Sequence, residues 1–388
     1  MSESYTYLDY AASAPLRSEA RAAYEEFLDR SYAGANPNSL HSPGRLAASA
    51  LEAARSGLAH LIDESLRPSE LVFTSGGTES NNLAILGLAR GMRQADSSRN
   101  TVVLSAIEHE SVLECASELR ALSFNVRLVK PNRAGVVSAE ALSEQLSHEV
   151  AVVSVMSANN ETGIIQPISD LAEATHEVGA LFHSDAVQSF CHSSLDLSAV
   201  DAASFAAHKF GGPRGIGALM LRARKPFITR SHGGGQEGAR RSGTQDVASA
   251  VAMYAAARAY MDNFDEHYRH TRENSDKLYE ALCSPYLGFK ATSPLDSAVE
   301  RLPGTVSVVA PGLESESLIV RLDECGFGVS AGSACASGSL EPSHVLSAMG
   351  LTKDEAFGAL RISFDERVSA SELDVFVEAL TKVVQSLR

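Results

Sequence analysis

The feature that most constrains the fold is a regular alternation of short apolar runs with amphipathic helical stretches between about residues 43 and 263. Short apolar runs of this kind are typical of buried strands. Buried strands that alternate with helices predict βαβ units and a mostly parallel sheet flanked by helices, which is an α/β fold. The expected strands are 70–74, 101–106, 125–129, 151–156, 180–185 and 202–207.

A long helical passage at 246–283 follows this alternation, and we expect it to lead into a smaller α+β domain. Strand-like runs at 304–310 and 359–364 and a C-terminal helix fit that second domain. The pattern predicts a large domain over residues 15–263 and a small domain formed by residues 1–14 and 264–388.

One segment of the small domain is unusual in composition, because every residue from Ser330 to Ser339 is Ser, Ala, Gly or Cys. Such a run has little side chain to bury and much backbone freedom. We therefore expect a mobile loop over about 330–340, with a single thiol, that of Cys335, in its middle.

Charge and cysteine content exclude several classes of protein. The net charge is −15, from 33 Lys and Arg against 48 Asp and Glu, which argues against binding to nucleic acid or to an anionic membrane surface. No secretory signal and no run of about 20 apolar residues are present, so we expect a cytoplasmic protein. The five cysteines include no C-x-x-C pair, which favours a reducing compartment over a disulfide framework or a zinc site.

The stretch TSGGTES, from Thr74 to Ser80, is a Gly-rich turn between an expected strand and an expected helix. Backbone N–H groups at a helix N-terminus attract anions, and the Thr78 hydroxyl adds a donor. The stretch lacks the ending of a Walker loop. It predicts either a phosphate-binding cup or a plain turn capped by Ser75 or Thr78, and alone it does not separate the two.

Two charged residues come at the ends of expected strands. Asp185 closes the strand at 180–185, where open α/β sheets bind ligands, although it could instead cap the next helix. Its neighbour His183 lacks further ligands at a metal-binding spacing, so we expect no metal. Lys209 follows the strand at 202–207 and either forms a Schiff base after desolvation or simply emerges at the surface.

His109 and Asn160 each follow a strand-like run, in IEHES and ANNETG. A lone His is more often structural than catalytic, so its weight comes from the groups around it. Together these features suggest one ligand that carries a phosphate, a carbonyl for Lys209, a basic nitrogen for Asp185 and a flat ring. Pyridoxal phosphate has all four, and we predict it as the cofactor.

The motifs also resemble, in order and nearly end to end, those of the NifS/IscS-type cysteine desulfurases. That family belongs to class V of the aminotransferase-fold pyridoxal-phosphate enzymes and has fold type I. The matching stretches are YLDYAASAPL, NPNSLHSPGR, TSGGTESNNLAI, EHESVL, ANNETGIIQPI, FHSDAVQS, AHKFGGPRGIGAL, HGGGQE with RRSGTQDV, GSACASGSLEPSHVL and LRISF.

The resemblance implies a role for each site residue. Lys209 would hold the cofactor through a Schiff base, Asp185 would pair with the pyridine nitrogen, and His109 would stack on the ring and move protons. Arg361 would form a bidentate pair with the substrate carboxylate, and Cys335 would be the nucleophile. The other expected contacts are Gly77, Thr78 and His208 at the phosphate, Gln188 at the ring hydroxyl, Asn160 near the ring and the substrate, and Thr244 at the phosphate of the neighbouring subunit.

The sequence departs from the family pattern at Ser13 and Ala14, at Ala206 and Ala207, and at the pair Asp365 and Glu366, and two of these departures bear on binding. Ala206 stands three residues before Lys209, where a Ser or Thr commonly donates to the phosphate. One charge-assisted hydrogen bond, worth about 1.5–3 kcal/mol, is therefore expected to be missing or replaced. Asp365 and Glu366 replace a Gly-containing pair after Arg361, and we expect them to alter substrate affinity.

The implied reaction is removal of sulfur from L-cysteine, which gives L-alanine and a persulfide on Cys335. The resemblance implies a homodimer and a sulfur-acceptor protein, such as an iron–sulfur scaffold or a tRNA-thiolation enzyme. The first alternative is a selenocysteine lyase or a related class V pyridoxal-phosphate enzyme. A scaffold without turnover is a weaker alternative, because the residues expected to carry the chemistry are all present.

Overall fold

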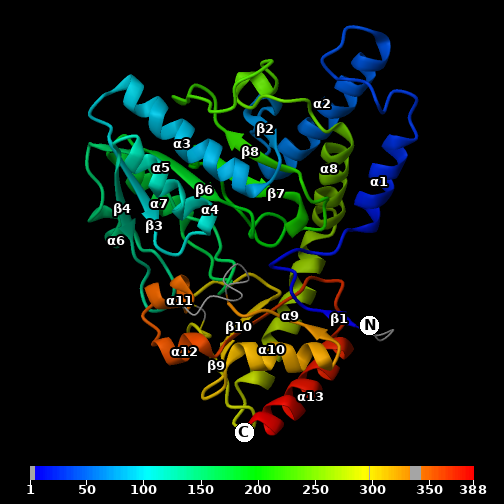
Figure 1. Cartoon of the computed structure of the whole chain (residues 1–388), viewed down its shortest axis with the longest axis vertical. Coiled ribbons are helices and arrows are strands. Elements are labelled where there is room, and N and C mark those ends of the chain that lie inside the picture. Colours follow the sequence, from blue (N-terminus) through cyan, green and yellow to red (C-terminus); the bar gives the residue numbers. More distant parts are fainter. Residues whose placement is uncertain (1–4, 297, 333–341) are drawn as a thin grey trace.

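The computed structural model describes residues 5–296, 298–332 and 342–388. Figure 1 shows a large α/β part above and a smaller α/β part below, with the C-terminus at the far end of the smaller part. The two parts are joined by α8 (Val247–Met261) and α9 (Phe264–Leu282), and the N-terminal segment runs along their junction.

Seven strands of the described chain form the central sheet of the large part. Their order across the sheet is β2 (Leu71–Thr74), β8 (Gly217–Leu221), β7 (Ala202–Ala206), β6 (Leu181–Asp185), β5 (Val150–Ser154), β3 (Thr101–Ser105) and β4 (Asn125–Val129). From β7 to β4 all neighbours are parallel, whereas β8 is antiparallel to both β7 and β2. The expected mostly parallel sheet is confirmed, and each of the six expected strands lies within about two residues of its predicted ends.

Helices cover both faces of this sheet because successive side chains of each buried strand point to opposite faces. On one face, Val102 and Leu104 of β3 pack with α3 (Gly77–Ala95) and α5 (Cys115–Ala121). On the other, Val103 packs in the cluster that includes the apolar side of α2 (Ser42–Ile62) and α8. The remaining helical elements of the large part are α1 (Ser18–Leu28), α4 (Glu110–Leu113), α6 (Ala139–Ser143), α7 (Ile168–Glu177), η1 (Pro68–Glu70), η2 (Ala207–Lys209) and η3 (Glu237–Ala239).

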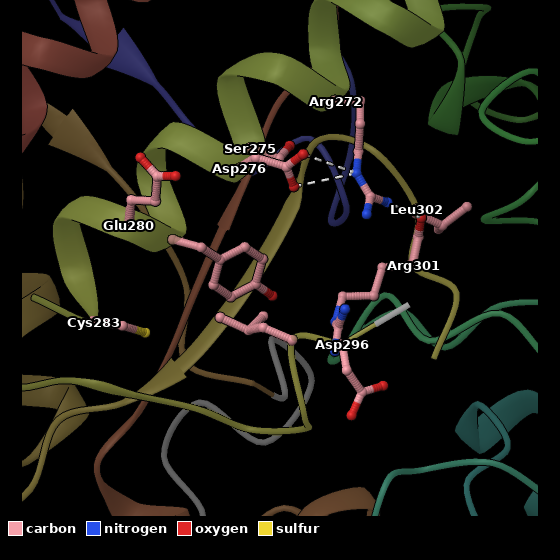
Figure 2. A pocket seen from close by; sticks show the side chains of 10 residues that line it. Arg272, Ser275, Asp276, Glu280, Cys283, Asp296, Arg301 and Leu302 are labelled. Atoms are coloured by element: carbon pink, nitrogen blue, oxygen red, sulfur yellow. Dashed lines mark hydrogen bonds and ion pairs between the residues drawn. The ribbon is translucent and has the colours of Figure 1, made fainter. Parts of the chain in front are cut away.

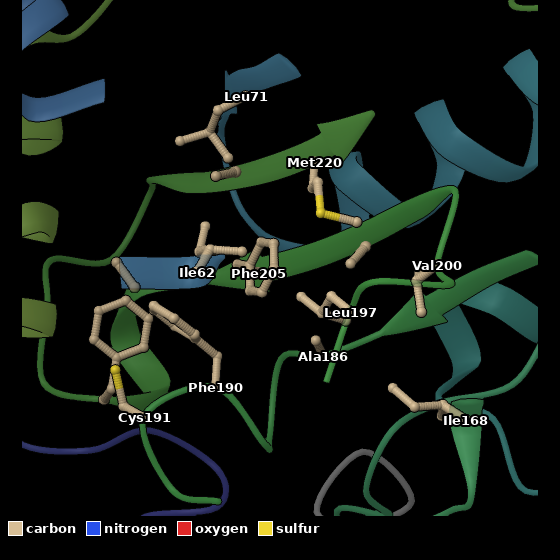
Figure 3. Packing of buried hydrophobic residues seen from close by; sticks show 14 of the residues in the cluster. Ile62, Leu71, Ile168, Ala186, Phe190, Cys191, Leu197, Val200, Phe205 and Met220 are labelled. Atoms are coloured by element: carbon tan, nitrogen blue, oxygen red, sulfur yellow. The ribbon is translucent and has the colours of Figure 1, made fainter. Parts of the chain in front are cut away.

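Aromatic side chains lie in the cluster that contains Val103, near the carboxyl ends of β6 and β7. Phe190 lies edge-on to Phe205, with ring centroids 5.1 Å apart (Figure 3). It also lies edge-on to Phe210, with ring centroids 5.4 Å apart. Edge-to-face pairs of this kind add to the stabilisation that burial itself provides. This packing holds the turn after β7 in place, and that turn carries Lys209.

In the small part, the residues that the structure describes form a three-stranded antiparallel sheet and a two-stranded parallel one. In the first, β10 (Thr305–Val309) lies between β12 (Ala359–Ser363) and β9 (Lys290–Ala291); in the second, β1 (Thr6–Tyr7) pairs with β11 (Phe327–Gly328). These strands pack with helices in a cluster that includes Leu8, Leu278 and Phe376. The other helices described in this part are α10 (Ser315–Glu324), α11 (His344–Ala348), α12 (Lys353–Phe357) and α13 (Ala370–Leu387).

The passage at 246–283 is helical as expected, but it forms two helices instead of one. Asn263 has φ −132° and ψ 33°, which is outside the helical region, so α8 ends and α9 begins around it. Asp and Asn side chains favour helix ends because they compete for backbone hydrogen bonds. The domain boundary near residue 263 stays a prediction. Val345 and Leu346 of α11 pack in the cluster that contains Val103, although we expected that segment to belong to the small domain.

No helix in the described ranges is long and apolar enough to cross a membrane.

Candidate active site

The structure places four predicted site residues at or just beyond the carboxyl ends of neighbouring strands. Asp185 is the last residue of β6, and Lys209 ends η2 directly after β7. His109 caps α4 just after β3, and Asn160 lies in the loop after β5. Because β3, β5, β6 and β7 are parallel neighbours, these side chains share one edge of the sheet, where ligands of open α/β sheets bind.

The N-terminal segment 9–13 runs along this edge and contacts several predicted residues. The Nζ atom of Lys209 donates to the carbonyl oxygens of Ala11 and Ala12, at 2.6 and 3.1 Å. The side-chain amide of Gln188 donates to the same Ala11 carbonyl at 2.9 Å. The sequence motif YLDYAASAPL contains this segment, but nothing in its residue types indicated that its carbonyls would meet the lysine.

His208 is held beside Lys209 by the same segment. Its Nδ1 lies 3.3 Å from the hydroxyl of Ser13. Burial, together with the positive charges of Lys209 and Arg214, lowers the pKa of His208 to about 4. The imidazole is therefore neutral at pH 7, and it contributes a hydrogen bond rather than a charge to the site.

A chain of side-chain hydrogen bonds joins Asp185 to His109. The amide nitrogen of Asn81 donates to Asp185 Oδ2 at 2.7 Å and to the Ser111 hydroxyl at 2.8 Å. That hydroxyl lies 2.8 Å from His109 Nδ1, which also accepts from the backbone N–H of Ser111 at 3.0 Å. A ring nitrogen that accepts carries no proton, so the neutral imidazole has its proton on Nε2. Asn81 and Ser111, which the sequence reasoning missed, thus orient both site residues.

Arg361, on β12 of the small part, is almost wholly buried, at 1% exposure. Its Nη1 donates to the Asn160 carbonyl at 2.8 Å, and its Nη2 pairs with Asp9 Oδ1 at 2.6 Å. Its Nε is buried with no hydrogen-bond partner among the described residues. The structure therefore brings Arg361 to Asn160, and it adds Asp9 as an unforeseen carboxylate partner from the N-terminal segment 9–13.

The N-terminus of α3 forms an open cup at the same edge. A Cβ atom on Gly77 would lie 2.8 Å from Val187 Cγ2, so only glycine allows this close approach to the β6 end, while a Cβ on Gly76 would meet nothing within 4 Å. No side chain of the described residues caps α3, which leaves its first N–H groups for an anion. With Asp185 and Lys209 nearby, the cup fits the phosphate of pyridoxal phosphate.

Ala206 lines this cup, as the sequence departure implied. Its Cβ is 3.5 Å from the position of a Cβ on Gly77, and the residue is buried. A hydroxyl at this place would face the first turn of α3, so the alanine removes one phosphate donor from the side of β7.

Two predicted residues are not placed with the others in the single chain. Thr244 is exposed on the segment between η3 and α8, which Arg241 ties to Glu79 of α3 at 3.0 Å. Cys335 lies outside the described residues. The residues that flank its segment are described: the Gly332 carbonyl lies 3.4 Å from Arg361 Nη1, and the Ser343 hydroxyl donates to Glu161.

A fully buried acid, Glu108, immediately precedes His109 in the chain. Its Oε1 accepts from the Met156 N–H at 2.6 Å, while its Oε2 has no partner in the described part of the chain. Burial, and to a lesser degree the charge of Asp185, raises the pKa of Glu108 well above 4.5. Burial thus favours the neutral form of this carboxyl over the ionised form.

We expect Glu108→Gln to stabilise the fold increasingly as the pH rises. The folded state binds the Glu108 proton more tightly than the unfolded state, so ionisation of the unfolded chain lowers wild-type stability above pH 4.5 and up to the folded pKa. The amide side chain of the variant cannot ionise and escapes this loss. Thermal unfolding at about pH 5 and about pH 8, with excess cofactor, should show a Tm difference that grows in favour of the variant. The exposed neighbour Glu110→Gln is the control, and a Tm difference independent of pH would contradict the prediction.

The cavity in Figure 2 lies away from this edge of the sheet. It has a volume of about 590 Å³, and its lining includes Arg272 and Tyr279 of α9, Cys283 just after α9, and Arg301 and Leu302 (Figure 2). None of the predicted site residues lines it.

Comparisons with known proteins identify the family of this chain. Residues 6–376 match the family model of class V aminotransferases. An IscS-like cysteine desulfurase of Mycobacterium tuberculosis is 40% identical over 98% of this chain and 97% of its own length. The cysteine desulfurase IscS of Dictyoglomus turgidum is 36% identical over 98% of this chain and 95% of its own.

Solved structures give the same result at the level of the fold. A NifS-like protein superposes with a TM-score of 0.88 at 33% identity and covers 99% of this chain and 100% of its own. SspA in complex with cysteine superposes with a TM-score of 0.76 at 30% identity. The match covers 92% of this chain and 98% of SspA. The chain therefore belongs to the class V aminotransferase family, as a pyridoxal-phosphate-dependent enzyme of the cysteine desulfurase type.

Proposed function

We propose that this protein removes the sulfur of L-cysteine, releases L-alanine and passes the sulfur on from a persulfide at Cys335. The observation that carries the proposal is the N-terminal segment 9–13, because Asp9 holds Arg361 while Ala11 and Ala12 hold Lys209. Three residues of chain span at most about 11 Å, so a carboxylate-binding group and an amine are kept close together. This is the pairing that an α-amino acid substrate requires.

The side chains divide the work of the reaction in this proposal. Arg361 binds the substrate carboxylate, which takes over from Asp9 as the partner of the guanidinium. Lys209 would hold the cofactor through its amine, and the same amine would take the Cα proton of the substrate. Asp185, kept in place by Asn81, pairs with the ring nitrogen. Bound pyridoxal phosphate supplies the electron sink that takes up the electron pair left at Cα.

Sulfur transfer needs a thiolate near the substrate sulfur. The Cys335 thiolate attacks that sulfur, the bond between substrate carbon and sulfur breaks, and the electron pair stays with the carbon, which is then protonated to give alanine. The balance is one cysteine and one thiol in, one alanine and one persulfide out. Gly332, three residues before Cys335 in the sequence, is anchored at Arg361, which supports this assignment.

Two further parts of the proposal concern partners. Thr244 is exposed, as it would need to be to reach the cofactor phosphate of a second subunit, and we propose a homodimer of this kind. The persulfide requires an acceptor protein, and an iron–sulfur scaffold or a tRNA-thiolation enzyme has the chemistry to take it. The relatives named IscS and the solved complex of SspA with cysteine support cysteine as the substrate.

The test compares L-cysteine with L-selenocysteine as substrates of the purified holoenzyme. We expect alanine release from cysteine, in an amount equal to the sulfide freed by a reductant. Turnover of selenocysteine alone would favour the selenocysteine lyase, and a coloured protein that releases alanine from neither substrate would leave only the scaffold alternative.

A further inference from the structure

A second contact between the two parts of the molecule lies beside the site, and Arg17 is at its centre. Arg17 precedes α1 and is 5% exposed. Its Nη2 pairs with Glu366 Oε1 at 2.7 Å and with Asp365 Oδ2 at 3.4 Å. We call these three residues the Arg17 cluster. Its two carboxylates are the acidic pair that departs from the family pattern, whereas the carboxylate that pairs with Arg361 is that of Asp9.

In the large part, Arg17 forms hydrogen bonds with the turn that follows Lys209. The Arg17 Nε donates to the Phe210 carbonyl at 3.0 Å, and its backbone N–H donates to the Gly211 carbonyl at 2.9 Å. A Cβ atom on Gly211, which has φ +85°, would lie 2.6 Å from Arg17 Cγ, so the turn and the arginine are in close contact. The guanidinium carbon also lies 5.0 Å from the centre of the Tyr260 ring.

On the side of the small part, the Arg17 cluster holds the end of β12. Asp365 and Glu366 follow that strand closely, and Arg361 is its central residue. Asp365 is also held by Arg367 at 2.6 Å, so its position does not depend on Arg17 alone. Glu366 pairs with Arg17 through one oxygen, and its second oxygen is buried without a hydrogen bond among the described residues.

We infer that Arg17 is a positioning residue that sets the separation between Lys209 and Arg361. The inference rests on the proposed function, because these two residues must engage the amine and the carboxylate of one amino acid. Arg17 fixes the lysine turn through Phe210 and fixes the arginine strand through Glu366. A planar guanidinium with several donors in a fixed fork suits a three-way contact of this kind, which a lysine cannot reproduce.

The consequence is a selective effect on substrate binding. If the strand end shifts, Arg361 meets the carboxylate less well, and the loss appears in KM more than in kcat. We expect Arg17→Gln and Glu366→Gln each to raise the KM for L-cysteine about tenfold, the size of one lost charge-assisted hydrogen bond. The value of kcat should stay within about threefold, and the cofactor colour should be unchanged.

The double variant Arg17→Gln/Glu366→Gln separates positioning from stability. Arg17→Gln alone leaves Glu366 buried without its cation and should lower Tm, whereas the double variant removes both charges and should recover Tm. We expect the KM of the double variant to stay raised. It should not exceed the higher of the two single-variant KM values, because both substitutions remove the same ion pair between Arg17 and Glu366. Arg21→Gln on α1, whose pair with Glu25 is exposed on both sides, is the control.

The KM and Tm values of these variants test the role of Arg17 alone. The proposed function is tested separately, by the assay of the wild-type enzyme. An unchanged KM in Glu366→Gln, or a KM that recovers together with Tm in the double variant, would overturn the positioning role of Arg17. Spectral titration with L-alanine, which carries the carboxylate and the amine but no sulfur, should show the same loss of affinity. Should Arg17→Gln fail to fold, Arg17→Lys and Glu366→Gln carry the test, and both should show the raised KM.

Discussion

Lys209→Ala is expected to abolish turnover of cysteine. The variant loses the amine that holds the cofactor and the base that takes the Cα proton, and the loss of a general base alone costs about 10²- to 10⁴-fold in kcat. The turn that carries Lys209 rests on packed aromatic rings, and its Nζ is presented to the carbonyls of Ala11 and Ala12. The fold should therefore survive the substitution, and the effect should be chemical.

Two measurements check this expectation. Alanine release from cysteine should fall to background, and the absorbance of covalently held pyridoxal phosphate should be absent while free cofactor still binds in the cup. Lys130→Ala, at an exposed lysine just after β4 on the same edge of the sheet, is the matched control and should keep full activity. An unchanged cofactor spectrum in Lys209→Ala would refute the Schiff-base role.

Cys335→Ala is expected to remove sulfur transfer and to leave cofactor binding intact. Only a thiolate is a good nucleophile, and burial disfavours it at most of the other cysteines. Burial raises the pKa of Cys115 to about 12, and it also raises the pKa of Cys191 and Cys283. Cys325 is exposed at the end of α10 and is the natural control.

The assay compares Cys335→Ala with Cys325→Ala. Both variants should have the colour of the holoenzyme and should respond spectrally to added cysteine. Alanine and reductant-released sulfide should be formed by Cys325→Ala at the wild-type rate, and in Cys335→Ala they should not exceed the background. Full turnover in Cys335→Ala would remove this residue from the mechanism and direct attention to Cys325.

The strand-end residues could be predicted from the sequence because local patterns determine them. Asp185 and Lys209 follow buried strands, and the carboxyl ends of neighbouring parallel strands meet at one edge of a sheet. The residues that orient them were missed for the opposite reason. Asn81 reaches Asp185 across 104 positions of the chain, and Asp9 reaches Arg361 across 352. A contact of that separation leaves no periodic or spacing signal.

The acidic pair after Arg361 illustrates the same limit. The sequence showed that Asp365 and Glu366 depart from the family pattern, and we expected them to alter substrate affinity. In the structure these carboxylates form ion pairs with Arg17 and Arg367 and not with Arg361. They therefore affect substrate affinity through the position of Arg361 and not through their charge. Arg17 offered no signal, because an arginine at the start of an amphipathic helix is most often exposed.

By itself the sequence determined the α/β architecture, the edge of the sheet at which the predicted site residues lie and the kind of cofactor, because strand alternation and motif chemistry are local. The tertiary structure decided which of those residues contact one another. It brought the N-terminal segment 9–13 between Lys209 and Arg361, buried Glu108 beside Asp185, and joined the two parts of the molecule through Arg17. These contacts depend on packing between segments far apart in the chain, and burial and pairing of that kind exist only once the chain has folded.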